Sequence, residues 1–254
     1  MDLSVFKGEL NGIGRKEERK ERAELLVLPT IYPMKHSSLE DPLESGSMLG
    51  SFRDLLEGEK SLKKYIEDRL KEKRGLAVGV EFGGDGESVF RDFSKNFFHK
   101  SVGVCLERYA NTPNDISMLT NFNGSDTTHY ILTGDMFTEE VYEKLASDIG
   151  VKKVDLILER MAAGLLTVSE IPLDNIKIFK KWYEMLNVGG LMFVQVPNEF
   201  GDILKRWVDF VKKNHKETLS VGCADDGCGF GVKVVRVHKL NSGAPDKLPL
   251  FENN

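Results

Sequence analysis

The sequence has no long apolar stretch, few cysteines and no excess of basic charge. No run approaches the roughly 18 apolar residues that cross a bilayer, and no charged-then-apolar signal segment opens the chain. We therefore expect a soluble, cytoplasmic protein without a membrane partner. Three cysteines in 254 residues do not make a disulfide framework. With 41% apolar residues, the chain can form one large domain, or one domain with an appendage.

Basic residues are not concentrated in a way that would suit a nucleic acid. The chain has 35 Lys and Arg against 40 Asp and Glu, a net charge of −5, whereas a duplex-binding surface needs clustered cations to displace counterions from phosphate. The densest basic run, RKEERKER at 15–22, is interleaved with acids. Its Glu18 and Arg22 have the i,i+4 spacing of a solvated helix face. No nucleic-acid partner is predicted.

A metal site is not predicted either. Cys223 and Cys228, in the stretch CADDGC, could hold a metal together with Asp225 and Asp226. There is no second Cys/His pair to complete such a site, so a polar hairpin that contains two thiols is the preferred interpretation. Cys105 lies in an apolar run and is expected to be a small core residue.

From residue 75 onward, short apolar runs alternate with helical patterns. The runs are continuous rather than alternating, which is typical of a parallel sheet covered by helices on both faces. At the end, 217–223 and 230–240 are joined by a turn-prone stretch and predict an antiparallel hairpin. We therefore expect a doubly wound, mostly parallel, seven-stranded α/β sheet. The five runs before the hairpin are GLAVGVE, SVGVCLE, THYILTGD, VDLILE and LMFVQVP.

Apolar residues at helical spacing predict the helices that cover this sheet. The second helix should carry a stripe of Val89, Phe90, Phe93 and Phe97, and Gly189–Gly190 should end the fourth. We divide the chain into an N-terminal extension (1–50), which could fold over the site as a lid, and one Rossmann-like domain (51–254). The predicted helices cover roughly 51–74, 87–98, 138–150, 172–190 and 200–214.

The first predicted strand is followed by a glycine-rich turn that carries several carboxylates, in GVEFGGDGESV at 79–89. In open α/β sheets, ligands bind at the carboxyl ends of the strands. A dinucleotide loop needs G-x-G-x-x-G, whose third position is Val89 here, and a P-loop needs a Lys after its glycines. Asp85 and Glu87 would also face the phosphates. Like charges about 4 Å apart repel by about 1 kcal/mol in water and several-fold more in a half-buried cleft.

Two interpretations of these carboxylates stay open. One is an adenosyl ligand that has no phosphate and carries positive charge, as S-adenosylmethionine does on its sulfonium and α-amino group. The other is that Glu81, Asp85 and Glu87 stabilise the N-terminus of the following helix and remain solvated.

Over roughly residues 51–238, the sequence resembles the class I (Rossmann-like) S-adenosylmethionine-dependent methyltransferases. Their loop is typically D/E-x-G-x-G-x-G; this chain has EFGGDGE at 81–87, with Asp85 in place of the second glycine. The resemblance implies S-adenosylmethionine as cofactor, its ribose held by Glu107, and its adenine contacted by Asp135 and Met136. Gly-Asp before a helix is also a common N-cap. The implied cofactor-binding residues are Glu81, Phe82, Gly83, Gly84, Asp85, Glu107, Arg108, Gly134, Asp135, Met136 and Glu159.

The catalytic residues are less well defined, because methyl transfer mainly requires alignment of the acceptor and, where needed, removal of a proton. Glu159, after the fourth apolar run, is the candidate catalytic residue, as a base or as a ligand for an acceptor's amine. It could instead pair with Arg160. Asn198 is a further candidate at the expected mouth of the site.

The chain lacks the N/D-P-P-Y/F motif of methyltransferases that act on amino groups of nucleobases or glutamine. The predicted function is therefore methyl transfer to a small molecule or a protein side chain. Because Asp85 could block the cofactor, the alternative is a catalytically inactive Rossmann-like module that binds a partner protein. An aminopropyl transferase that uses decarboxylated cofactor is a third hypothesis.

Overall fold

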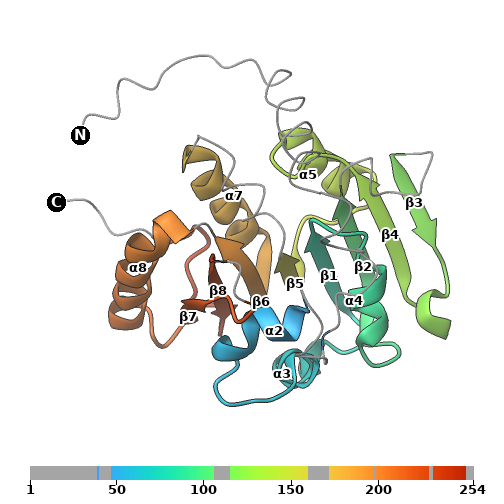
Figure 1. Ribbon diagram of the computed structural model, residues 1–254. Helices are drawn as coiled ribbons and strands as arrows, with labels where there is room; N and C mark the ends of the chain where they lie inside the picture. The colour runs from blue at the N-terminus through green and yellow to red at the C-terminus, as the bar shows by residue number, and fades with distance from the viewer. Residues whose placement is uncertain are drawn as a thin grey trace.

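A single mixed sheet of eight strands forms the centre of the computed structural model, which describes residues 39, 47–105, 115–159, 172–196, 198–228 and 231–249 (Figure 1). Its strand order is β3-β4-β2-β1-β5-β6-β8-β7. Helices cover both faces of the sheet. The predicted doubly wound, mostly parallel α/β architecture is thus confirmed.

Five parallel strands form the middle of the sheet, and they coincide with the five apolar runs, because strands buried on both faces need successive apolar side chains. Phe82, the last residue of β1, is level with Val104 of β2 and with Glu159 of β5. The carboxyl ends of these strands therefore meet at one edge of the sheet. The five strands are β1 (Ala77–Phe82), β2 (Phe98–Cys105), β4 (Thr128–Thr133), β5 (Val154–Glu159) and β6 (Leu186–Val196).

Both borders of the sheet are antiparallel. At one border, β8 (Lys233–Lys239) lies between β6 and β7 (Leu219–Asp225) and runs antiparallel to both, which confirms the predicted hairpin. At the other border, β3 (Ile116–Leu119) pairs antiparallel with β4. The expectation of seven strands is therefore wrong by one. β3 has only four residues in a stretch rich in Asn, Thr and Ser, so it lacks the apolar run that marks the other strands.

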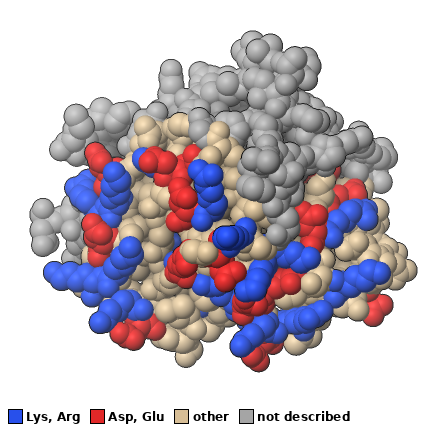
Figure 2. All heavy atoms as spheres, turned by 60° about the horizontal axis from the view of Figure 1, so that its bottom comes forward, with Lys and Arg blue, Asp and Glu red and all other residues tan. Residues whose placement is uncertain are grey.

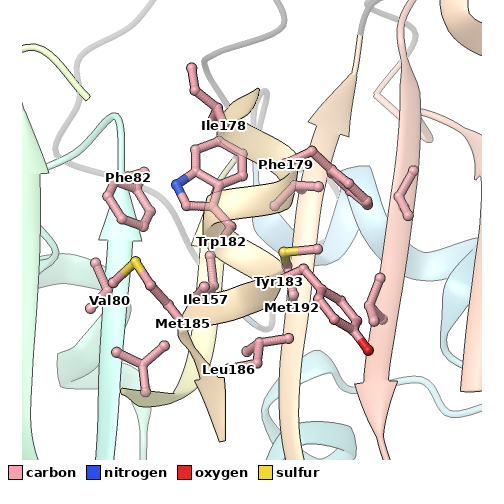
Figure 3. Packing of buried hydrophobic residues seen from close by; sticks show 14 of the residues in the cluster. Val80, Phe82, Ile157, Ile178, Phe179, Trp182, Tyr183, Met185, Leu186 and Met192 are labelled. Atoms are coloured by element: carbon pink, nitrogen blue, oxygen red, sulfur yellow. The ribbon is translucent and has the colours of Figure 1, made fainter. Parts of the chain in front are cut away.

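Three helices cover one face of the sheet: α5 (Glu139–Ser147), α7 (Pro172–Met185) and α8 (Gly201–Asn214). Figure 3 shows how the side chains of α7 meet those of the strands beneath it, with Trp182 beside Phe82 of β1. The two rings lie 5.1 Å apart between centroids, within the range of favourable aromatic pairs. Burial of these large side chains fixes the helix on the sheet.

The opposite face is covered by shorter helices, and its buried residues form a second apolar cluster with the undersides of the strands. Short 3₁₀ turns connect or flank these helices. The elements on this side are α2 (Met48–Phe52), η2 (Arg53–Leu55), α3 (Leu62–Arg69), η3 (Lys71–Lys73), α4 (Glu87–Asp92) and η5 (Phe122–Gly124). A further 3₁₀ turn, η6 (Asn198–Phe200), directly precedes α8.

Three predicted helices differ from the observed ones. The helix expected over 51–74 is broken, because Glu57 and Gly58 adopt positive φ values of 55° and 91°. Helix α4 ends at Asp92; the predicted stripe continues only as buried side chains beyond it. Helix α7 ends at Met185 rather than at the glycines. β6 already begins at the next residue, Leu186, which pairs with β5.

Part of the predicted N-terminal extension packs into the core. Leu39 is fully buried and its N–H donates to Asp92 Oδ2 at 2.9 Å, and helix α2 is buried throughout. Helix α2 crosses the boundary expected at residue 50. The division of the chain into an extension and a domain stays a prediction, as does the lid, because most of 1–50 lies outside the described residues. Among the residues described, no helix has the length and apolar character needed to cross a membrane.

The amino ends of β1, β5 and β6 are joined by the carboxylate of Asp155, which is 4% exposed. Its Oδ2 accepts the backbone N–H of Val78 at 2.9 Å, and its Oδ1 accepts Lys73 Nζ at 2.6 Å and Asn187 Nδ2 at 2.8 Å. The strand register shifts at both Val78 and Asp155. The carboxylate therefore replaces backbone bonds that the irregular ladder cannot make.

Candidate functional site

The glycine loop follows β1, at the point where strand order reverses: β2 and β4 lie on one side of β1, and β5 and β6 on the other. Gly83 and Gly86 have φ values of +93° and +75°, a region that L side chains rarely adopt. The N–H of Gly83 donates to Val104 O at 2.8 Å, which attaches the loop to the end of β2. The loop thus occupies the usual ligand position of an open α/β sheet.

The loop folds back onto β2, and a glycine in that strand makes this possible. A Cβ on Gly103 would lie 1.9 Å from the carbonyl oxygen of Asp85. On the loop side, a Cβ on Gly86 would lie 2.9 Å from His129 Cε1 and 3.1 Å from the Cα of Gly103. The path of the loop therefore depends on a glycine in β2 and on a glycine in the loop itself. Gly103 is not among the site residues that the sequence predicts.

The three carboxylates of the loop have different surroundings. Glu81 is 6% exposed, and its Oε2 lies directly beneath Gly84, 2.7 Å from where a Cβ would be. Asp85 Oδ1 accepts the N–H of Glu87 at 3.0 Å, and burial raises the pKa of Asp85. Glu87 pairs with Arg91 at 3.0 Å. Asp85 and Glu87 thus bond to α4, as the second interpretation expects, but Glu81 is buried and Asp85 is half-buried rather than solvated.

The segment after β4 is brought close to the glycine loop through the end of β2. The N–H of Gly134 donates to Cys105 O at 2.8 Å, one residue along β2 from the anchor of the loop. Asp135 is 4% exposed, and its Oδ1 accepts the N–H of Phe137 at 2.9 Å. Met136 is also buried. The N-cap of α5 is Thr138, so the local role of Asp135 is a turn before the helix rather than the cap itself.

Glu159 lies at the end of β5, level with Phe82, and is fully buried. Its Oε2 accepts the backbone N–H of Gln195 in β6 at 3.1 Å. The regular pairing of these two strands ends at Leu158 and Phe193, so the carboxylate extends the ladder by one bond. A structural role for Glu159 is therefore evident, and its catalytic role stays a prediction.

Several predicted site residues lie outside the described part of the chain: Glu107, Arg108 and Arg160. Asn198 is exposed in η6. The structure brings together two groups of predicted residues, which are joined through the end of β2: Glu81, Phe82, Gly83, Gly84 and Asp85 within or after β1, and Gly134, Asp135 and Met136 after β4. Glu159 lies beside the first group, because it is level with Phe82 in the neighbouring strand β5.

The cysteines behave as ordinary core or turn residues where they are described. Cys105 is 2% exposed, and burial raises the pKa of its thiol to about 12, so that the predicted core role is confirmed. Asp225 pairs with Lys233, and Asp226 Oδ2 accepts Gln195 Nε2 at 2.5 Å. Asp225 is thus paired within the hairpin and Asp226 is bonded to β6, while the absence of metal stays a prediction.

His129 of β4 is the main residue near the loop that the sequence did not reveal. It is fully buried; its Nδ1 lies 2.8 Å from Ser101 Oγ and its Nε2 lies 2.8 Å from Asp85 O. Burial lowers the pKa of His129 to about 4, so the ring is neutral at pH 7. A lone histidine in an apolar run carries no motif, and only the folded loop places it against Asp85.

We expect the stability that His129 contributes to be lost on acidification. Its pKa falls from 6.5 to about 4 on folding, so the unfolded chain takes up a proton at a higher pH than the folded chain does. The contribution of His129 to the free energy of unfolding therefore declines by roughly 3 kcal/mol as the pH is lowered from 6.5 to 4. Urea unfolding of the wild type and of His129→Phe should show the stability gap between them narrowing from pH 6.5 to 4. A gap independent of pH would contradict this expectation.

Comparisons with known proteins find solved structures of similar fold but do not assign the chain to a family. Neither a protein-family model nor a curated protein matches the sequence. Similar solved structures include the MycE methyltransferase of the mycinamycin biosynthetic pathway, in complex with Mg, SAH and mycinamycin VI, at 11% identity and a TM-score of 0.43 over 70% of this chain and 46% of that chain. An rRNA methylase from Streptococcus thermophilus has 11% identity and a TM-score of 0.38, covering 69% and 94% of the two chains.

The N-methyltransferase NodS from Bradyrhizobium japonicum aligns equally distantly, at 11% identity and a TM-score of 0.38 over 70% of this chain and 94% of that chain. The chain spans less than half the length of MycE. At this level of similarity, the alignments support no inference about substrates or site residues. The fold follows from the sheet itself: five parallel strands, with an antiparallel β8 inserted between β6 and β7, form the class I methyltransferase arrangement that the sequence resemblance implied.

Proposed function

We propose that the protein binds S-adenosylmethionine above the glycine loop and transfers its methyl group to an acceptor. The observation that carries this proposal is the buried carboxylate of Glu81 beneath Gly84, in a tight loop at the reversal point of a methyltransferase-type sheet. The segment 134–136 is held beside this loop through the end of β2. In this proposal the two groups contact different parts of one extended ligand.

The charge of the loop supports a cationic, phosphate-free nucleoside over a dinucleotide. A pyrophosphate normally binds where backbone N–H groups and the helix macrodipole attract an anion. Here the first turn of α4 is already served by Asp85, and Glu81 lies buried below the loop. A diphosphate would meet this negative charge at short range in a region of low dielectric, where repulsion is several-fold stronger than in water.

In the proposed complex, the loop from Gly83 to Asp85 holds the methionine part of the ligand. Glu107 would accept hydrogen bonds from both ribose hydroxyls, with Arg108 beside it, and Asp135 and Met136 would contact the adenine. The cofactor supplies an activated methyl group on sulfur; the protein aligns the acceptor and, where needed, accepts a proton. Glu159 is the proposed proton acceptor, once its bond to the Gln195 N–H is exchanged for the acceptor's.

Isothermal titration calorimetry with the folded protein tests the proposal. S-Adenosylmethionine and S-adenosylhomocysteine should both bind with a stoichiometry of one, and NAD and ADP should not bind. Competition between the two adenosyl ligands would place them in one site. Absence of binding at high micromolar ligand, in protein whose circular dichroism is that of a folded α/β chain, would overturn the proposal.

The acceptor is proposed to be a small molecule or a protein side chain. Figure 2 shows one face of the molecule, on which Lys and Arg are interspersed with Asp and Glu rather than gathered by sign. This pattern supports the expectation that no nucleic acid binds there, which stays a prediction. Incubation with radiolabelled cofactor and separate pools of metabolites, proteins and RNA would reveal which class accepts the methyl group.

A partner-binding module without catalysis is the second candidate function, because Asp85 replaces a loop glycine of the methyltransferases. The carboxylate of Asp85 is turned toward α4, where it accepts the Glu87 N–H. This orientation favours a functional loop over a blocked one. If only Asp85→Gly, and not the wild type, bound the adenosyl ligands, the second candidate would be favoured instead.

A further inference from the structure

His129 is a buried polar residue that the proposed chemistry does not use. It comes from the early part of β4, yet its ring reaches the underside of the glycine loop and is fully buried there. Its two nitrogens each have one partner at 2.8 Å: Ser101 Oγ in β2 and the carbonyl oxygen of Asp85 in the loop. The histidine therefore links two neighbouring strands to the loop.

The two partners determine which nitrogen carries the proton. The carbonyl oxygen of Asp85 can only accept, so Nε2 must be the protonated nitrogen. The bare Nδ1 then accepts the hydroxyl proton of Ser101, which satisfies the neutral ring completely. The charged groups that face the ring are Glu87 and Arg91 of α4, and they pair with each other at 3.0 Å. The surroundings thus favour a single neutral tautomer.

The ring cannot turn without disturbing the loop. It stacks on Phe122 with centroids 4.5 Å apart and planes at 21°, and Phe90 lies 6.0 Å away on another side. Gly86 approaches so closely that a Cβ would lie 2.9 Å from the ring. Packing, hydrogen bonding and loop path are therefore mutually dependent at this position.

We propose that His129 of β4 is the positioning residue of the glycine loop. Its Nε2–H donates to the Asp85 carbonyl and holds it against Gly103 of β2, and this hydrogen bond sets the affinity of the loop for the adenosyl ligand. The coupling to ligand rests on the proposed function, whereas the effect on the loop does not. His129 acts through the backbone of Asp85 and touches no reacting atom.

A pair of substitutions separates the hydrogen bond from the packing. His129→Phe keeps an aromatic ring on Phe122 but removes the donor, and His129→Gln keeps an N–H donor near the position of Nε2. Calorimetry with S-adenosylhomocysteine should show about tenfold to hundredfold weaker binding for His129→Phe, because the loop carbonyl loses its partner. His129→Gln should recover most of the affinity. Equal binding by wild type and folded His129→Phe would overturn the inference.

Two measurements on the ligand-free protein test the role of His129 in the loop independently of the proposed function. The ¹⁵N spectrum of the His129 ring should show Nε2 protonated and Nδ1 bare at pH 7; the opposite tautomer would overturn the inference. Amide hydrogen exchange of Gly86 and Glu87 should be faster in His129→Phe than in the wild type. Faster exchange in a protein that binds no adenosyl ligand would overturn the proposed function and support the role of His129 in the loop.

If His129→Phe does not fold, Ser101→Ala serves instead. This substitution removes the hydroxyl that donates to Nδ1 and keeps the Asp85 carbonyl, which requires the proton to be on Nε2. We expect the Nε2–H tautomer to persist in the ring spectrum and S-adenosylhomocysteine to bind within about threefold of wild-type affinity, because the bond to the loop is kept. A loss of about a hundredfold with the Nε2–H tautomer retained would show that the bond to Asp85 does not set the affinity and would overturn the proposal.

Discussion

Gly103→Ala is expected to abolish tight binding of adenosyl ligands while the sheet still folds. The added methyl group would lie 1.9 Å from the carbonyl oxygen and 2.0 Å from the carbonyl carbon of Asp85, distances that real Cβ atoms do not reach. The obstacle is backbone rather than a flexible side chain, so the loop must move away from β2. We expect about a hundredfold weaker binding, equivalent to about 2.7 kcal/mol, and a loss of about 1–3 kcal/mol in stability from overpacking.

The matched control for this prediction is Gly222→Ala in β7, on the distant border of the same sheet. A Cβ there would lie 3.3 Å from Leu55 Cδ2, a side-chain atom that can shift by a few tenths of an ångström. Calorimetry with S-adenosylhomocysteine should therefore give wild-type affinity for Gly222→Ala. Wild-type affinity for Gly103→Ala as well would show that the ligand does not depend on the path of the loop, and would count against the site described above.

The sequence was sufficient for the parts of the fold that depend on burial along a single strand. The five parallel strands are continuous apolar runs because both of their faces are covered, and the hairpin of β7 and β8 follows from two strand-like runs around a turn. The edge strand β3 is different: it has only four residues and pairs with a neighbouring strand on one border alone. Its existence depends on pairing with β4, which no local pattern reports.

Helix ends were predicted less well for a similar reason. A helical pattern continues into Leu186, but this residue pairs with Val154 of β5, and the strand ladder takes precedence over local propensity. Between α2 and α3, the positive φ of Glu57 interrupts a continuous apolar pattern. Glu57 also pairs with the buried Arg236 of β8 at 2.7 Å, a long-range contact that the amphipathic pattern could not reveal.

The candidate site was predictable only where a motif marks it. The glycine loop and Asp135 were found because glycine turns and strand-end acids have recognisable spacing. Gly103 and His129 were not, since a glycine and a histidine inside apolar runs have no signature of their own. Their importance comes from the contacts of the β1–α4 loop with Gly103 of β2 and His129 of β4, which exist only in the folded protein.

Asp155→Ala is expected to cause the largest loss of stability without affecting ligand affinity. The buried carboxylate accepts three hydrogen bonds, from Val78 N–H, Lys73 Nζ and Asn187 Nδ2. Removal would leave a backbone N–H of the central strand β1 without its acceptor, at a level where the ladder is irregular. Loss of these charge-assisted bonds should lower the free energy of unfolding by about 3 kcal/mol, measurable by urea denaturation.

Because Asp155 lies at the amino end of β5, away from the glycine loop, S-adenosylhomocysteine should bind the folded variant with wild-type affinity. Asp155→Asn should recover part of the stability, since its amide oxygen still accepts one bond. Asp68→Ala is the surface control: Asp68 pairs with Lys64 at 2.8 Å on the exposed face of helix α3, and its removal should leave the urea midpoint unchanged. If Asp155→Ala lowered affinity as strongly as Gly103→Ala does, the two ends of the sheet would not be independent, and weaker binding in any variant could no longer be assigned to the loop.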